Sequence, residues 1–134
     1  MARGFKTAKG AKKACDQVFS ELIRRHGRCE NCGGINGRLE CAHIISRRFS
    51  NTRVTFSNAF CLDSKCHHYF TDHPVEFGRF VENSWASKYY TQNLKKAHSL
   101  VKVDWEEQIE LLRDAKARLD EGEITIQELR DYED

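Results

Sequence analysis

The sequence predicts an α+β domain in which a short strand–loop–strand–helix unit has helices on both sides. Apolar residues recur at helical spacing towards both ends of the chain, whereas the stretch RLECAHII at 38–45 alternates as a short strand does. Two pairs of cysteines enclose this central part, which indicates a bound zinc ion. A length of 134 residues suits a single domain, and the zinc would compensate for a modest core.

The N-terminal part is predicted to be a basic arm followed by a helix. Residues 1–10 carry three basic side chains and little apolar content, so we expect a flexible arm there. Apolar side chains from residue 11 onward fall on one face, and Gly27 follows the last of them, which predicts an amphipathic helix over 11–26. The other face of this helix is basic. Residues 11–134 are expected to form one domain.

The central part is predicted to contain the two strands. Residues 28–38 are rich in glycine and are expected to form tight turns. A strand over 39–44 follows, and a polar loop then leads to a second extended piece at 58–60. The segment from about 64 to 71 is predicted to be a helix. This order places one helix directly after a pair of short strands.

The C-terminal part is predicted to be helical. Pro74 suits the first turn of a helix, and residues 92–103 are expected to be a connector. Asp104, with Glu107 three positions later, matches a capping box that opens another helix. The residues after Gly122 are predicted either to form a short last helix or to fray. The apolar face of the helix after Pro74 comprises Phe77, Phe80, Val81 and Trp85.

The formal net charge of +2 conceals a strong division along the chain. Residues 1–53 carry 12 Lys and Arg against 4 Asp and Glu, residues 54–103 carry 6 against 4, and residues 104–134 carry 4 against 12. The net charges are therefore +8, +2 and −8. A basic half joined to an acidic helical region indicates a surface for a polyanion such as a nucleic acid, although two solvated charged faces would give the same counts.

No segment of the sequence predicts secretion or a membrane span. The basic N-terminus is not followed by an apolar run of signal-peptide length, and no stretch approaches the roughly 18 apolar residues of a membrane helix. We therefore expect a cytoplasmic protein without a membrane partner. In that compartment paired cysteines are more often metal ligands than disulfides.

Four of the six cysteines have the spacing of a structural zinc site. Cys29 and Cys32 form a knuckle, and Cys61 and Cys66 supply a second pair, so four thiolates would enclose a tetrahedral Zn²⁺. Carboxylates also bind Zn²⁺, and Asp63 is therefore an alternative fourth ligand that would leave Cys61 packed as a small apolar side chain. The remaining cysteines, Cys15 and Cys41, are expected to be buried thiols.

Three polar residues accompany the cysteine pairs in a characteristic order. His43 ends the predicted strand, Asn58 follows 15 residues later, and His67 comes nine residues after Asn58, directly behind Cys66. This pattern resembles the HNH endonucleases, a branch of the ββα-metal nucleases, in their zinc-stapled form. The resemblance covers about residues 28–85 and is strongest with the small HNH proteins of bacteriophages.

The resemblance implies a metal-dependent DNA endonuclease with a ββα-metal core, whose products carry 5′-phosphate and 3′-hydroxyl ends. His43 would act as general base on a water molecule, and Asn58 would fasten the loop between the strands. His67 would hold one divalent ion, Mg²⁺ or Mn²⁺, against the scissile phosphate. Imidazole titrates near neutral pH and a divalent ion neutralises charge on the reacting phosphate, so these residue types suit the chemistry.

One position departs from the family pattern. Many HNH enzymes place a second metal ligand directly before the base, and this chain has Ala42 there, which implies weak binding of the catalytic ion. His68 is a candidate additional ligand, and so are Asp72 and His73 further along the same predicted helix.

The expected DNA contacts are basic residues of the loop between the strands. Arg47, Arg48 and Arg53 would contact phosphates there, together with the basic first helix. One such site cuts one strand, so a monomer would nick DNA, and a double-strand break would need a dimer or two successive events. The chain is accordingly expected to be a monomer or a weak homodimer.

Two other functions fit the sequence. A zinc-knuckle DNA-binding module that does not cut is the leading alternative, and Ala42 is the best argument for it. The resemblance to phage proteins also implies a role beside terminase or another packaging protein. In a packaging adaptor, the acidic region 104–134 would dock the partner, and this role is compatible with either of the others.

Overall fold

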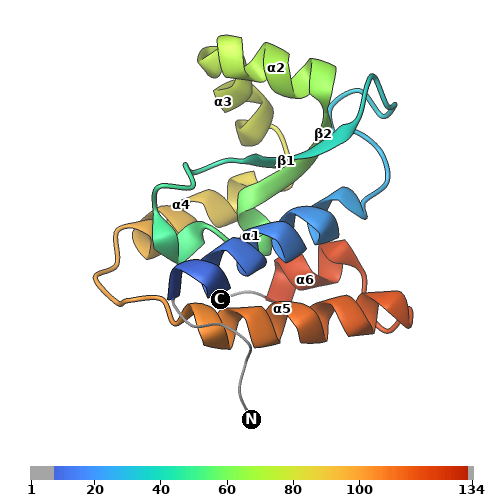
Figure 1. The fold of residues 1–134 in the computed structure, drawn as a ribbon. Helices are drawn as coiled ribbons and strands as arrows, with labels where there is room; N and C mark the ends of the chain where they lie inside the picture. The colour runs from blue at the N-terminus through green and yellow to red at the C-terminus, as the bar shows by residue number, and fades with distance from the viewer. Residues whose placement is uncertain (1–7, 133–134) are drawn as a thin grey trace.

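The protein is mixed α+β, as the sequence predicts, and the computed structural model describes residues 8–132 (Figure 1). Within this range, six α-helices accompany one antiparallel sheet of two strands. In chain order the elements are α1 (Ala8–Arg24), β1 (Leu39–His43), β2 (Ala59–Asp63), α2 (Ser64–Asp72), α3 (Pro74–Glu82), α4 (Ser87–Ala97), α5 (Trp105–Asp120) and α6 (Ile126–Tyr132).

The two strands form a hairpin whose faces contact different parts of the molecule. Cys41 lies opposite Cys61, and Ala42 lies opposite Phe60. Because successive side chains of a strand point to opposite faces, the two cysteines pack in the core that contains α1, whereas Ala42 and Phe60 pack in the core that contains α2 and α3. The hairpin thus separates two apolar clusters, and His43 lies where β1 ends.

The larger cluster lies between the hairpin, α1 and α5. Helices α1 and α5 run side by side (Figure 1), and their facing side chains are buried. The acidic region predicted from the charge counts is therefore part of the main core rather than a separate tail. The buried apolar side chains of the two helices include Cys15, Phe19, Leu22, Ile23, Trp105, Ile109 and Leu112.

The smaller cluster is aromatic and covers the other face of the hairpin. Phe60 of β2 is fully buried, and its ring lies 4.7 Å from Phe80 and 5.0 Å from Trp85, measured between ring centroids. Phe70 of α2 stacks on Phe80 at 5.0 Å. The apolar residues predicted for the helix after Pro74 do share this cluster, but α3 ends at Glu82, so Trp85 joins it from the segment after the helix. These contacts fix α2 and α3 over the sheet.

Two predicted segments differ from the structure. Helix α1 begins at Ala8, so the end of the predicted basic arm belongs to the helix, and the rest of that arm lies outside the described residues. The connector predicted over 92–103 is wrong in its first half, because α4 continues to Ala97. The Asn93 amide donates to the Ser57 hydroxyl at 3.0 Å. The buried positions of α4 are Asn93 and Ala97, whereas Tyr90 and Leu94 are exposed, so large apolar side chains do not mark its buried face.

The C-terminal helices follow the predicted signals. The Asp104 carboxylate accepts hydrogen bonds from the backbone N–H groups of Glu106 and Glu107, both at 3.1 Å, and α5 ends shortly before Gly122, whose φ is +75°. The last segment forms the short helix α6. Among residues 8–132, no helix combines the length and the apolar character that crossing a bilayer requires.

Candidate metal centre and histidine site

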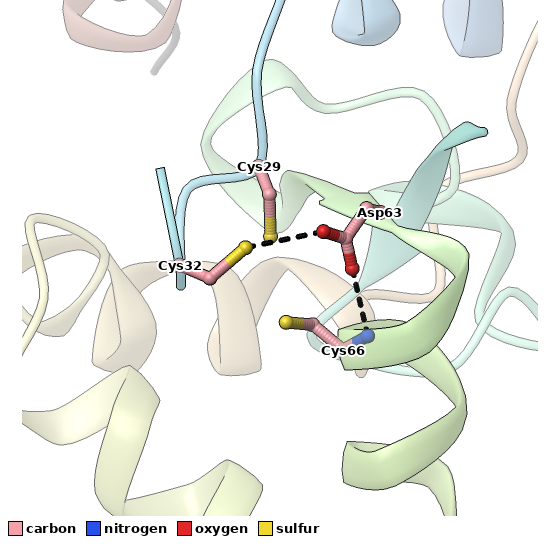
Figure 2. Close-up of side chains that lie close together, drawn as sticks. All are labelled: Cys29, Cys32, Asp63 and Cys66. Carbon is pink, nitrogen blue, oxygen red and sulfur yellow. Dashed lines mark hydrogen bonds between the residues drawn. The ribbon is translucent and has the colours of Figure 1, made fainter. Parts of the chain in front are cut away.

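Four side chains converge into a group that could hold a metal ion. They are Cys29 and Cys32 from the loop after α1, Asp63 from the end of β2, and Cys66 from the first turn of α2. Their ligand atoms all lie within 4.8 Å of one another, and Figure 2 shows the three sulfurs and the carboxylate pointing toward a common centre. Three thiols and one carboxylate are a donor set that suits Zn²⁺.

The loop that carries Cys29 and Cys32 is held in a tight turn by its own backbone hydrogen bonds. The Cys29 N–H donates to the Gly34 carbonyl, and the Gly33 N–H donates to the Cys29 carbonyl, both at 2.9 Å. Gly33 has a φ of +77°, which favours glycine. Burial raises the pKa of the Cys29 thiol, but hydrogen bonds from nearby backbone N–H groups outweigh this and lower it below the usual range. The loop therefore favours a thiolate at Cys29.

Asp63 connects the metal group to the start of α2. One carboxylate oxygen accepts from the Cys66 N–H at 2.8 Å and caps the helix, and the other accepts from the Asn36 N–H at 2.9 Å (Figure 2 draws the first). The second oxygen also lies 3.1 Å from the Cys32 sulfur. Burial would raise the pKa of Asp63, but these hydrogen bonds hold it well below its usual range, so the carboxylate is ionised.

The structure corrects one predicted zinc ligand, because Cys61 lies outside this group. Its side chain is fully buried in the middle of β2, opposite Cys41, in the core shared with α1. Burial raises the pKa of Cys61 to about 11, so it stays a neutral thiol. The geometry favours the alternative fourth ligand, Asp63, because this residue ends β2 beside the helical turn that carries Cys66.

His43 is held at the end of β1 by a backbone carbonyl. Its Nε2 donates to the carbonyl oxygen of Arg53 at 2.8 Å, which leaves the Nδ1 lone pair free. The ring also contacts Phe19 of α1 at 5.6 Å between centroids. Burial lowers the pKa of His43, helped by the charges of Arg47 and Arg53, and outweighs the hydrogen bond to the Arg53 carbonyl and the charge of Asp16, which raise it. His43 is therefore neutral near pH 7 and able to accept a proton.

Asn58 fastens the loop between the two strands from inside. Its side chain is 1% exposed and satisfies three backbone groups. The amide oxygen accepts from the Ile45 N–H at 2.9 Å, and the amide nitrogen donates to the carbonyls of Ile45 and Thr52, both at 3.1 Å. Because this loop also carries Arg53, whose carbonyl holds His43, the Asn58 side chain stabilises the surroundings of the imidazole.

His67 lies on α2 and is oriented by a carboxylate of β1. Its Nδ1 donates to Glu40 at 2.8 Å, and the other oxygen of Glu40 accepts from Arg38 at 2.9 Å. The hydrogen bond from Arg38, with that from His67, lowers the pKa of Glu40, which is therefore a carboxylate. In the neutral imidazole this hydrogen bond leaves the lone pair on Nε2, as a metal ligand requires.

His43 and His67 line the same two hollows in the surface. The larger has a volume of about 410 Å³ and is bounded on one side by Asp16 and Ser20 of α1. The smaller, of about 190 Å³, extends between the two histidines to Phe77. The two imidazoles thus approach one shared space from a strand end and from a helix.

The three predicted phosphate-contacting arginines differ in availability. Arg47 is exposed and lines the larger hollow, and Arg48 is exposed and lies over the ring of Phe49. Arg53 is committed to other contacts, because its guanidinium binds both carboxylate oxygens of Asp16 at 2.7 Å each. Its remaining nitrogen donates to the Arg47 carbonyl at 2.8 Å. In this structure the Arg53 side chain therefore holds the loop to α1, and its contact with a phosphate stays a prediction.

The additional candidate metal ligands do not line either hollow. His68 is 80% exposed at its side chain and pairs with Asp72 at 3.2 Å, and the His73 ring donates to the Tyr69 carbonyl at 2.7 Å. Ala42, at the position that departs from the family pattern, is buried beneath the smaller hollow. Of the predicted ligands for the catalytic ion, the structure places only His67 beside His43.

Two residues of this site were missed by sequence reasoning. Glu40 and Asp16 contact the histidine site directly or through one neighbour, yet neither belongs to a spacing motif. Alternation along the strand places Glu40 on the face that α2 covers, which was a usable signal. Asp16 is an acidic residue in a basic helix, and only the fold brings it to Arg53.

No family model, curated protein or solved structure matches this chain.

Proposed function

We propose that this chain is a metal-dependent DNA endonuclease of the HNH type, with a structural zinc ion. The observation that carries the proposal is the pair of histidines at one hollow, each with one ring nitrogen occupied by an acceptor and the other free. The carbonyl of Arg53 holds His43, and the carboxylate of Glu40 holds His67. This arrangement suits one base and one metal ligand.

The residues would act as follows on a phosphodiester in the larger hollow. His43 takes a proton from a water molecule at Nδ1, and the resulting hydroxide attacks phosphorus so that the bond to the 3′ oxygen breaks and this oxygen takes a proton from a solvent water. His67 would hold a divalent ion through Nε2. Bound Mg²⁺ or Mn²⁺ would supply charge neutralisation at the phosphate and the leaving oxygen. The products have 5′-phosphate and 3′-hydroxyl ends, and Arg47 and Arg48 supply cationic contacts to the strand.

The structural zinc has a separate place in the proposal. Cys29, Cys32, Cys66 and Asp63 would bind it and hold the loop after α1 against the start of α2. Because His67 directly follows Cys66, the zinc would also fix the part of α2 that presents the metal-binding imidazole. A tetrahedral site closed by four protein ligands is typical of a structural rather than a catalytic zinc.

Nicking of a supercoiled plasmid tests the proposal. Wild-type protein should nick in Mg²⁺ or Mn²⁺, whereas His43→Ala and His67→Ala should each lose at least about 100-fold in rate, the scale of a lost general base. His26→Ala, which changes a histidine outside both hollows, should retain the wild-type rate. Equal nicking by wild type and His43→Ala would reject the nuclease.

The same experiment distinguishes the non-catalytic alternative. The burial of Ala42 and the exposure of His68 leave His67 alone as a ligand for the catalytic ion, which favours weak metal binding. A protein that binds DNA in a gel-shift assay but does not nick at any Mn²⁺ concentration would be a zinc-knuckle binding module. Binding of a packaging partner such as terminase is a further proposal from the resemblance, and it is tested by co-purification with that partner.

A further inference from the structure

Helix α1 reaches the proposed general base through an ion pair with the loop between the strands. The carbonyl oxygen that accepts from His43 Nε2 belongs to Arg53. The side chain of the same residue binds Asp16 through two parallel hydrogen bonds of 2.7 Å. One residue therefore faces the imidazole with its backbone and α1 with its guanidinium.

The Asp16–Arg53 pair has the geometry of a rigid connection. Its side chains are 16% exposed at Arg53 and 23% at Asp16, and the planar guanidinium meets both carboxylate oxygens. Asp16 is held in place by its own helix, because the neighbouring Cys15 is fully buried and Phe19, one turn later, is 1% exposed. Phe19 also contacts the His43 ring, so α1 approaches the imidazole from two directions.

We propose that Asp16 is a positioning residue for His43: by holding the guanidinium of Arg53, it fixes the carbonyl that orients the imidazole. The inference rests on the proposed function insofar as His43 is the general base. It assigns α1, which lies outside the strand–loop–strand–helix unit, a direct part in the site. It also gives the guanidinium of Arg53 a role inside the protein.

The first readout is the imidazole itself, which does not depend on nuclease activity. Two-bond ¹H–¹⁵N correlation spectra report which ring nitrogen of His43 carries the proton. Wild type should show the Nε2–H tautomer near neutral pH, whereas Asp16→Ala should show a mixture of the two tautomers. Asp120→Asn is the matched control, because Asp120 also pairs with an arginine near α1, Arg25, but lies away from both hollows.

The second readout is the nicking rate, separated into kcat and KM. Asp16→Ala should lower kcat by about 10- to 100-fold, the scale of a small misplacement of a reacting group, and leave KM for DNA unchanged. The double variant Asp16→Ala, Arg53→Ala should be no slower than Asp16→Ala alone, because both changes break one connection. Asp16→Asn keeps the size of the side chain and replaces Asp16→Ala if circular dichroism finds that variant unfolded.

Each outcome decides the inference. If Arg53 binds DNA instead, Asp16→Ala should free its guanidinium and lower KM for DNA, and the double variant should raise KM. That result overturns the positioning role. An unchanged tautomer together with an unchanged kcat overturns it as well, while the proposed function stands. If wild type nicks no DNA in either metal, the proposed function fails, and the tautomer spectra alone decide whether Asp16 positions His43.

Discussion

At the scale of single residues, two cysteines of one predicted pair have opposite surroundings. Cys66 lies within the metal group, whereas Cys61 is a buried thiol of the core. We expect Cys66→Ser to lose the bound zinc and Cys61→Ala to retain one zinc per chain with only a packing loss. Metal analysis of the purified variants checks this. Equal zinc contents in the two variants would contradict the assignment of Asp63 in place of Cys61.

The surroundings of His43 also predict the pH dependence of nicking. A protonated imidazole cannot take a proton from water, so the rate should rise with pH through the pKa of His43. Because burial lowers that pKa, the rise should be centred below the usual value of about 6.5. A pH profile of kcat/KM measures this. An acid limb centred above pH 6.5 would disagree with the neutral, partly buried imidazole.

At the scale of elements, helix α6 is tied to the cysteine loop by a buried ion pair. Arg130 of α6 is 1% exposed and binds both carboxylate oxygens of Glu30, each at 2.9 Å. Glu30 lies between Cys29 and Cys32, and it also accepts from the Trp85 indole at 3.1 Å. The guanidinium lies 4.0 Å above the Trp85 ring. The last helix thus supports the loop of the candidate metal centre.

Breaking this ion pair should destabilise the protein much more than breaking an exposed one. Arg130→Ala leaves the Glu30 carboxylate buried without its partner, and we expect a loss of about 3–5 kcal/mol in the free energy of unfolding. Arg25→Ala removes an arginine whose pairing with Asp120 is exposed, and its effect should be small. Urea unfolding of the two variants compares them. Similar urea midpoints would show that the Arg130–Glu30 pair contributes no more to stability than the exposed pair.

The elements differ in how well the sequence predicts them. The hairpin, α2 and α5 follow from local signals: alternation around Cys41, and a capping aspartate at Asp104. Helix α4 was missed because its buried positions are Asn93 and Ala97 rather than large apolar side chains, and Asn93 pairs with the distant Ser57. The identity of the fourth zinc ligand, Cys61 or Asp63, also depends on the fold rather than on local sequence. Spacing permits both as ligands, and only the way β2 enters α2 decides between them.

At the scale of the whole molecule, the basic and acidic parts of the chain are one structural unit. Helix α5 packs along α1, and its Trp105 and Ile109 lie in the same core as Phe19. Deleting residues 104–132 should therefore unfold the protein rather than merely remove a docking surface. Circular dichroism of the shortened chain checks this. A cooperative melt at the wild-type temperature would instead mark the acidic region as separable.

Metal removal should affect the whole molecule, while loss of the proposed catalytic ligand should not. The group around Cys29 joins the loop after α1 to the start of α2, and through Glu30 it also reaches α6. Because such a site does not exist in the unfolded chain, the free energy of metal binding adds to the stability of the fold. A zinc chelator or Cys29→Ser should therefore abolish or strongly lower the thermal transition. His67→Ala should melt as wild type does, because this side chain is 35% exposed and its partner Glu40 keeps its pairing with Arg38. Calorimetry compares the melting temperatures of the two variants. Equal decreases would contradict the prediction that the cysteine group, and not His67, stabilises the fold.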